Sequence, residues 1–170
     1  MVRRDMSIGV VFLVATLAAA PAASDAQALV SHLRPQHARI TGWLVDGTMR
    51  SPTIRALIAR VEASDVLVYL TFTSPRPGVS ASLTFMADTP YGRMVRLAIR
   101  PDLSSRDTMA MIAHELQHVI EVAEHPEVRS ERGFEALFRR IGHPTTFAEH
   151  HYDTAAALDI GDRVRHELAS

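Results

Sequence analysis

Residues 105–124 read SRDTMAMIAHELQHVIEVAE, and the rest of the chain is best interpreted around this stretch. Its apolar residues recur at the three-and-four spacing of an amphipathic helix. Ser104 or Ser105 supplies an N-cap, Asp107 favours the first turn, and Pro126 ends the pattern. We therefore predict a helix here. Its apolar face comprises Met109, Ile112, Leu116, Val119, Ile120 and Ala123.

This helix carries the pattern H-E-x-x-H at residues 114–118. Residues four apart lie on one helix face, about 6 Å from each other, so the imidazoles of His114 and His118 can bind one metal ion. Glu115 is turned about 100° from His114, where it can act on a water molecule instead of binding the metal. The alternative is a pair of solvated histidines on a surface helix. Their position beside the apolar face favours the metal site.

The chain begins with the pattern of a signal peptide. Two arginines precede an apolar run from Ile8 to Ala20, and small residues follow up to a cleavage site after Ala26. This run is shorter than the roughly 20 residues of a membrane-spanning helix. We expect an exported protein, periplasmic or secreted, without a stable membrane span once residues 1–26 are removed. The alternative is an uncleaved N-terminal anchor.

Composition narrows the function classes further. The net charge is −1 and no basic cluster is present, so nothing indicates nucleic-acid binding. The chain contains no cysteine. A metal site must therefore be built from histidines and carboxylates, which suits a catalytic zinc ion better than a structural thiolate site. Residues 27–170 have the size of one domain.

Around the motif we expect an α+β domain. A helix starts at Ser51-Pro52, while residues 27–47 have no clear pattern. β-branched and aromatic residues with turn signals between them predict three strands, which short links would join into an antiparallel meander. The predicted strands are residues 65–73, 80–87 and 93–100. Two further helices follow the motif, over residues 127–141 and 152–168.

A catalytic zinc site needs a third protein ligand. Asp153 is the first candidate, because it lies four residues before Ala157 on the apolar face of the last predicted helix. A carboxylate facing inward is costly unless it is paired or binds a cation. The alternative is an ordinary helix N-terminal aspartate stabilised by the helix dipole.

Other candidates are weaker on geometry. Glu121 shares the face of His114, but three ligands on one straight helix would lie nearly in line, so it fits better as a hydrogen-bond partner of His118. Glu124 has the spacing of a third metzincin ligand, but that motif needs a glycine at position 121. Glu131 and Glu135 are expected to be solvated.

The residues just before Asp153 complete the candidate set. His150 and His151 are alternative ligands or residues lining the cleft, and Tyr152 is a candidate for stabilising an oxyanion.

The segments AHELQH (113–118) and DTAAA (153–157) resemble the gluzincin-type zincin metallopeptidases. The chain also looks like small exported bacterial proteins that have the same helix and a Tyr-acidic-Thr segment near the C-terminus. The resemblance covers residues 105–168 and implies a compact zincin-like domain over 27–170, with a short sheet beside the active-site helix. In that group the third ligand is usually Glu, whereas Asp153 is one methylene shorter.

We therefore expect a zinc-dependent hydrolase, and specifically a metallopeptidase acting on peptides or proteins. Glu115 would be the general base for a water molecule held by Zn²⁺. An edge strand could bind an extended peptide by strand addition. One alternative is a non-catalytic exported protein, a degenerate peptidase that only binds zinc or peptide. Another is a hydrolase of a non-peptide substrate.

Overall fold

The computed structural model describes residues 32–72, 74, 80–144 and 152–169. The predicted signal peptide and the histidines at 150 and 151 lie outside these residues. In chain order the elements are β1 (Leu33–Pro35), α1 (Ala38–Arg50), α2 (Pro52–Glu62), β2 (Val66–Phe72), β3 (Ala81–Thr89), β4 (Gly92–Ile99), α3 (Ser105–Ala123), α4 (Glu131–Ile141), β5 (His143–Pro144), β6 (Tyr152–Asp153) and α5 (Ala155–Glu167). The domain is therefore mixed α+β, as predicted.

The main sheet has the strand order β1-β2-β4-β3. β2 pairs in parallel with both β1 and β4, and only β3 is antiparallel to its neighbour β4. The predicted antiparallel meander is therefore wrong. The physical reason lies in β2, whose residues Val66 to Leu70 are nearly all apolar and mostly buried. Such runs are typical of interior parallel strands. β2 is covered along both edges, and β3 is left at the edge of the sheet.

The N-terminal part of the domain also differs from the prediction. The helix α2 begins at Pro52 as expected, and the Ser51 hydroxyl caps it by accepting a hydrogen bond from Ile54 N at 3.0 Å. However, α2 is not the first element, because β1 and α1 precede it. β1 was not predictable from its own three residues, since it is stabilised by pairing with β2.

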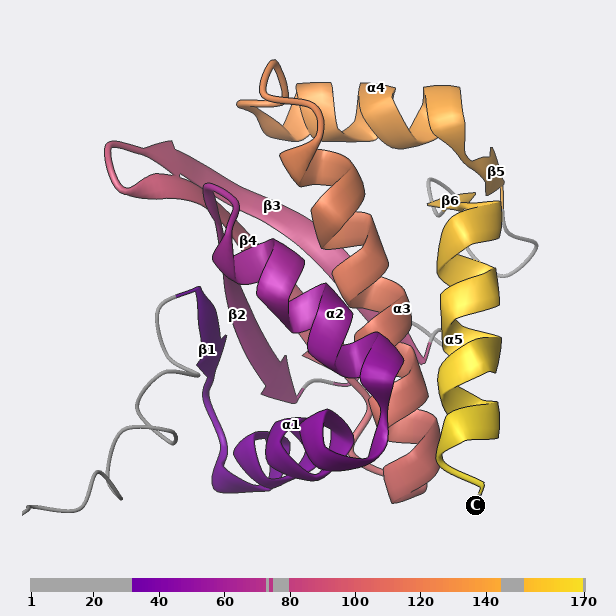
Figure 1. Ribbon diagram of the computed structural model, residues 1–170. Helices are drawn as coiled ribbons and strands as arrows, with labels where there is room; N and C mark the ends of the chain where they lie inside the picture. The colour runs from indigo at the N-terminus through magenta and orange to yellow at the C-terminus, as the bar shows by residue number, and fades with distance from the viewer. Residues whose placement is uncertain (1–31, 73, 75–79, 145–151, 170) are drawn as a thin grey trace, which may run out of the picture.

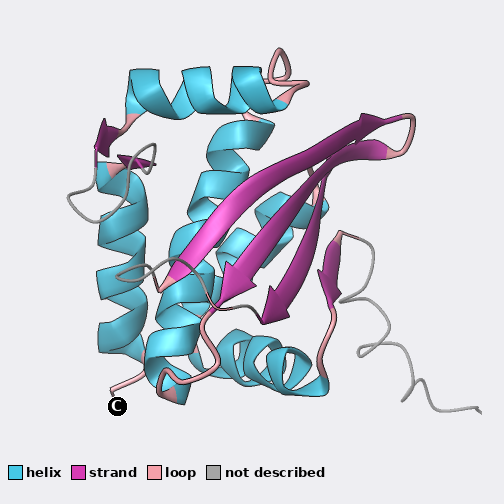
Figure 2. Cartoon of the chain, turned by 180° about the vertical axis from the view of Figure 1, so that it is seen from behind, coloured by secondary structure: helices cyan, strands magenta, loops and turns pink. Residues whose placement is uncertain are grey.

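The helices lie on one side of the sheet (Figure 1). α3 packs against the sheet, with α2 on one side of it and α5 on the other. The core between these layers includes Val68, Val95, Leu97, Leu116 and Val119. The opposite face of the sheet carries no helix in the described part of the chain (Figure 2). The motif-bearing helix is therefore the central helix of the domain.

A buried arginine holds the C-terminal end of α3. Arg93 of β4 is 0 % exposed and donates hydrogen bonds to the carbonyls of Val122 and His125, both at 2.8 Å. Its Nε also donates to Asp65 Oδ2 at 2.9 Å. The last carbonyls of a helix have no partner within the helix, and a positive charge there matches the helix dipole. Arg93 thus fixes the end of α3 against the sheet.

Candidate metal centre

The predicted motif helix is confirmed and its middle is buried. α3 begins after Ser104, whose hydroxyl accepts a hydrogen bond from the Asp107 N–H at 3.1 Å. His114, Glu115 and His118 are only 7 %, 5 % and 5 % exposed. Solvated surface histidines are therefore excluded. Buried polar side chains need hydrogen-bond partners, and the partners of these two imidazoles are carboxylates.

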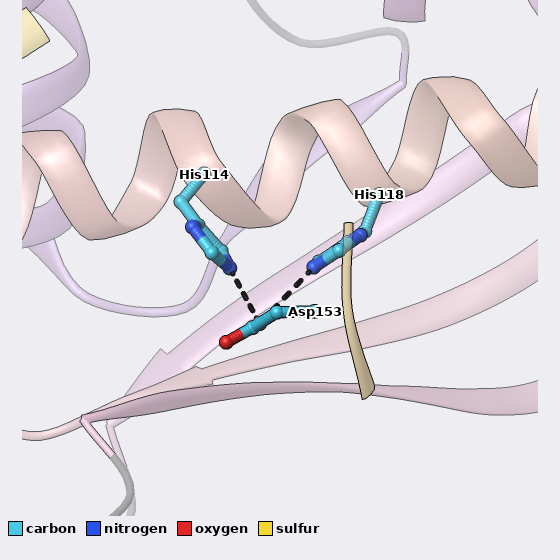
Figure 3. Close-up of side chains that lie close together, drawn as sticks. All are labelled: His114, His118 and Asp153. Atoms are coloured by element: carbon cyan, nitrogen blue, oxygen red, sulfur yellow. Dashed lines mark hydrogen bonds and ion pairs between the residues drawn. The ribbon is translucent and has the colours of Figure 1, made fainter. Parts of the chain in front are cut away.

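Asp153 lies between the two imidazole rings (Figure 3). Its Oδ1 is 3.1 Å from Nε2 of His114 and 3.7 Å from Nε2 of His118. The ring centroids of the two histidines are 4.9 Å apart, and each residue of the trio offers a ligand atom within 4.8 Å of the others. Two nitrogen donors and one carboxylate oxygen thus converge, and this group has the geometry to hold a metal ion.

Asp153 reaches this position from an extended backbone and not from a helix. The predicted helix start at 152 is three residues early, because α5 begins at Ala155 with Thr154 as its N-cap. Asp153 belongs to β6, where it pairs with His143 of β5. The argument that placed Asp153 on the apolar face of a helix was therefore wrong, although the residue does lie beside the two histidines. The N-terminal end of α5 and the short β5–β6 pairing together direct its carboxylate.

Close packing of α5 on α3 brings this end of the chain to the motif. Gly161 faces α3, and a methyl group placed there would meet His114 Cβ at 3.6 Å and Ala110 O at 3.7 Å. These are ordinary contact distances, so the position accepts a small side chain but leaves little room for a larger one.

Glu121 is a hydrogen-bond partner of His118. Its Oε2 lies 2.8 Å from His118 Nδ1, and its Oε1 accepts a hydrogen bond from the Thr154 hydroxyl at 2.6 Å. Burial alone would raise the pKa of Glu121, but the hydrogen bonds from His118 and Thr154 lower it overall. The glutamate is therefore a carboxylate at neutral pH. It holds Nδ1 of His118 as a donor and directs Nε2 towards Asp153.

The ionisable side chains of the site shift one another's pKa values. Burial opposes protonation of His118, but hydrogen bonds to Asp153 and Glu121 outweigh it and raise its pKa to about 9. Hydrogen bonds from His114 and His118 hold the pKa of Asp153 well below its usual range. Burial raises the pKa of Glu115. Without a metal ion, a proton on His118 thus balances part of the negative charge of Asp153 and Glu121.

Of the remaining candidates, Tyr152 lies next to Asp153 and three glutamates lie on the surface. Tyr152 is half-buried in β6, opposite Pro144. Glu124 forms a surface ion pair with Arg60 at 2.6 Å, in agreement with its rejection as a ligand. Glu131 and Glu135 are exposed, as expected.

Two neighbours of the site were not anticipated. Thr154 contacts Glu121 as described above, and the ring of Phe138 from α4 packs edge-on against His118 at 5.1 Å between centroids. The Thr154 cap had a sequence signal, since a threonine precedes the alanines of α5, but its contact with Glu121 had none. Phe138 lies within the helix predicted over residues 127–141, but nothing in the sequence indicated its contact with His118.

Comparisons with models of known protein families, with curated proteins and with solved structures found no match. Among the described residues, no helix combines the length and apolar character needed to cross a membrane.

Proposed function

We propose that the chain is a zinc-dependent hydrolase and that its substrates are peptides or proteins. The observation that carries this proposal is the position of the Asp153 carboxylate between the imidazoles of His114 and His118. Three protein donors with a glutamate beside them are the composition expected of a catalytic zinc site, whereas structural sites use four.

The donor chemistry fits zinc. Imidazole nitrogens and a carboxylate oxygen are common zinc ligands, and the absence of cysteine removes the soft sulfur donors of structural sites. The hydrogen bond from His118 Nδ1 to Glu121 supports the same assignment, because metal-binding histidines usually donate their second nitrogen to a carboxylate or carbonyl. His114, His118 and Asp153 would hold the ion.

A bound zinc ion would supply a Lewis acid that polarises a carbonyl group and lowers the pKa of a water molecule to about 7. Glu115 would accept the proton that the attacking water loses and return it to the leaving amine nitrogen. Burial raises the pKa of Glu115, which makes its carboxylate a better proton acceptor. The same burial limits competing contact with bulk water.

The position of β3 supports a peptide substrate. In the described part of the chain β3 pairs only with β4, so its outer edge offers backbone donors and acceptors, and β3 also packs against α3. An extended peptide added to this edge would run beside the motif helix. Strand addition recognises the peptide backbone, which favours peptides over other hydrolysable substrates.

Metal analysis and a hydrolysis assay test the proposal together. Purified protein, freed of metal and reloaded with Zn²⁺, should bind one equivalent, and His118→Ala should bind much less. The loaded protein should cleave members of a quenched-fluorescence peptide library. Equal metal content in both proteins would refute the site. Stoichiometric zinc without cleavage of any peptide would instead favour the non-catalytic binding protein.

A further inference from the structure

Thr154 makes two hydrogen bonds with a single buried hydroxyl group. The residue is 5 % exposed, and its Oγ1 accepts from the Ala157 N–H at 3.1 Å while donating to Glu121 Oε1 at 2.6 Å. A threonine hydroxyl has one proton to donate, and a carboxylate can only accept it. The direction of both bonds is therefore determined.

Through Glu121, the Thr154 hydroxyl is connected to His118, a candidate metal ligand. The second oxygen of Glu121 lies 2.8 Å from His118 Nδ1. A carboxylate at this nitrogen fixes the ring orientation and leaves the lone pair of Nε2 for a metal ion. Thr154 limits the rotation of the Glu121 carboxylate, so it acts on the orientation of His118 through that residue.

The same hydroxyl also constrains the third ligand. Thr154 directly follows Asp153, and by capping α5 it fixes the backbone where β6 passes into the helix. Its bond to Glu121 ties this point to α3. Among the described helix caps, Ser51 makes a comparable link from α2 to Glu167 of α5, but away from the metal centre. Ser130 accepts a hydrogen bond from Gly133 N at 3.1 Å and lies on the surface.

From these contacts we propose that Thr154 is a positioning residue of the metal centre, which sets the relative placement of His118 and Asp153 in addition to capping α5. This inference rests on the proposed metal site. It predicts that metal affinity depends on the Thr154 hydroxyl, whereas an ordinary cap would affect only stability.

The test compares three variants with the wild-type protein. Thr154→Val removes the hydroxyl at nearly constant volume, Thr154→Ser keeps it, and Ser130→Ala removes a cap that does not contact Glu121. Zinc affinity is measured by competition with a chelator, and stability by urea unfolding of the metal-free protein. Thr154→Val should weaken zinc binding about 10- to 100-fold, the range for lost outer partners of a ligand. Thr154→Ser should bind like wild type, and Ser130→Ala should lose stability alone.

A double-mutant cycle identifies the route of the effect. If Thr154 acts through Glu121, Thr154→Val should have a much smaller effect in a Glu121→Gln background than in the wild type, because coupled residues are not additive. Additive losses of affinity would overturn the proposed route through Glu121.

Several outcomes separate this inference from the proposed function. Wild-type zinc affinity in Thr154→Val, with zinc bound by the wild type, would overturn the positioning role and leave the metal site intact. A wild-type protein that binds no zinc would overturn both. If Thr154→Val does not fold, Thr154→Asp replaces it, since aspartate caps helices well but offers Glu121 no proton when ionised. Unchanged zinc affinity in that variant would also overturn the inference.

Discussion

Asp153 Oδ1 lies 3.1 Å from Nε2 of His114, although 39 residues separate the two in the chain. The contact exists because α5 packs along α3 and starts beside the motif. His118 Nε2 is the second nitrogen near the same oxygen, at 3.7 Å. A buried cluster of this kind needs a cation to balance it, and either a proton or a metal ion can take that role.

Replacing Asp153 should therefore impair metal binding selectively. Asp153→Ala is expected to lower zinc affinity by more than the roughly 100-fold that loss of an outer partner costs, because a direct ligand is lost. Asp159→Ala is the matched control, since Asp159 lies on α5, just beyond Asp153 in the chain, and forms an exposed ion pair with Arg163. Chelator competition measures both. Equal affinities in the two variants would remove Asp153 from the site.

Glu115→Gln should separate metal binding from turnover. The amide is nearly isosteric but cannot accept the proton, so peptide hydrolysis should fall by about 10²- to 10⁴-fold or more while zinc content is unchanged. Glu124→Gln makes the same chemical change on the exposed end of α3 and should retain activity. Full activity in Glu115→Gln would contradict the role of general base.

Gly142 is predicted to hold the strand that carries Asp153 close to α4. A methyl group at Gly142 would lie 2.8 Å from Phe138 O, 3.0 Å from Tyr152 Cβ and 3.1 Å from Asp153 O. Two of these atoms are backbone and cannot move away easily. Gly142→Ala should thus displace β6, weaken zinc binding and reduce stability by about 1–3 kcal/mol.

A second glycine provides the control for this prediction. A methyl group at Gly42 on α1 would meet nothing within 4 Å. Gly42→Ala should therefore leave zinc binding unchanged and stabilise the helix by up to about 1 kcal/mol. Urea unfolding and chelator competition test both variants. Wild-type zinc affinity in Gly142→Ala would show that β6 does not depend on this close approach.

Asp65 should make the metal-free protein sensitive to acid. The hydrogen bond from Arg93 lowers the pKa of Asp65 below its ordinary value of 3.8. A lowered folded-state pKa contributes stability that is present above the unfolded value and is lost as pH falls through the folded value. The free energy of unfolding should therefore decrease below about pH 4, and Asp65→Asn should lessen this decrease.

The same variant should be less stable at neutral pH. Asp65→Asn leaves the buried Arg93 without its counter-charge, and we expect a loss of about 1–3 kcal/mol, less than for a fully buried pair because Asp65 is half exposed. Asp46→Asn breaks an exposed pair with Arg50 and should cost less than about 1 kcal/mol. Urea unfolding between pH 3 and pH 7 in the presence of a chelator checks both. Equal losses in the two variants would contradict a special role for Asp65.

The motif helix and its pair of histidines could be predicted because they depend on local periodicity. Residues four apart on a helix face the same way in any fold, so His114 and His118 needed no tertiary information. The positions of β2, β3 and β4 along the chain were likewise close to those observed. The antiparallel pairing of β3 with β4 was also as predicted, but the partners of β2 were not, because the choice between neighbours depends on which strand must be buried along both edges.

The linear chain alone determined that two imidazoles and a glutamate share one helical turn, since backbone geometry imposes this at short range. Tertiary packing decided which carboxylate completes the group, how Glu121 and Thr154 join α5 to α3, and that Arg93 is buried under the end of the helix. These relationships join residues far apart in sequence. They follow from the docking of helices and strands on a common core, where burial makes each polar contact necessary.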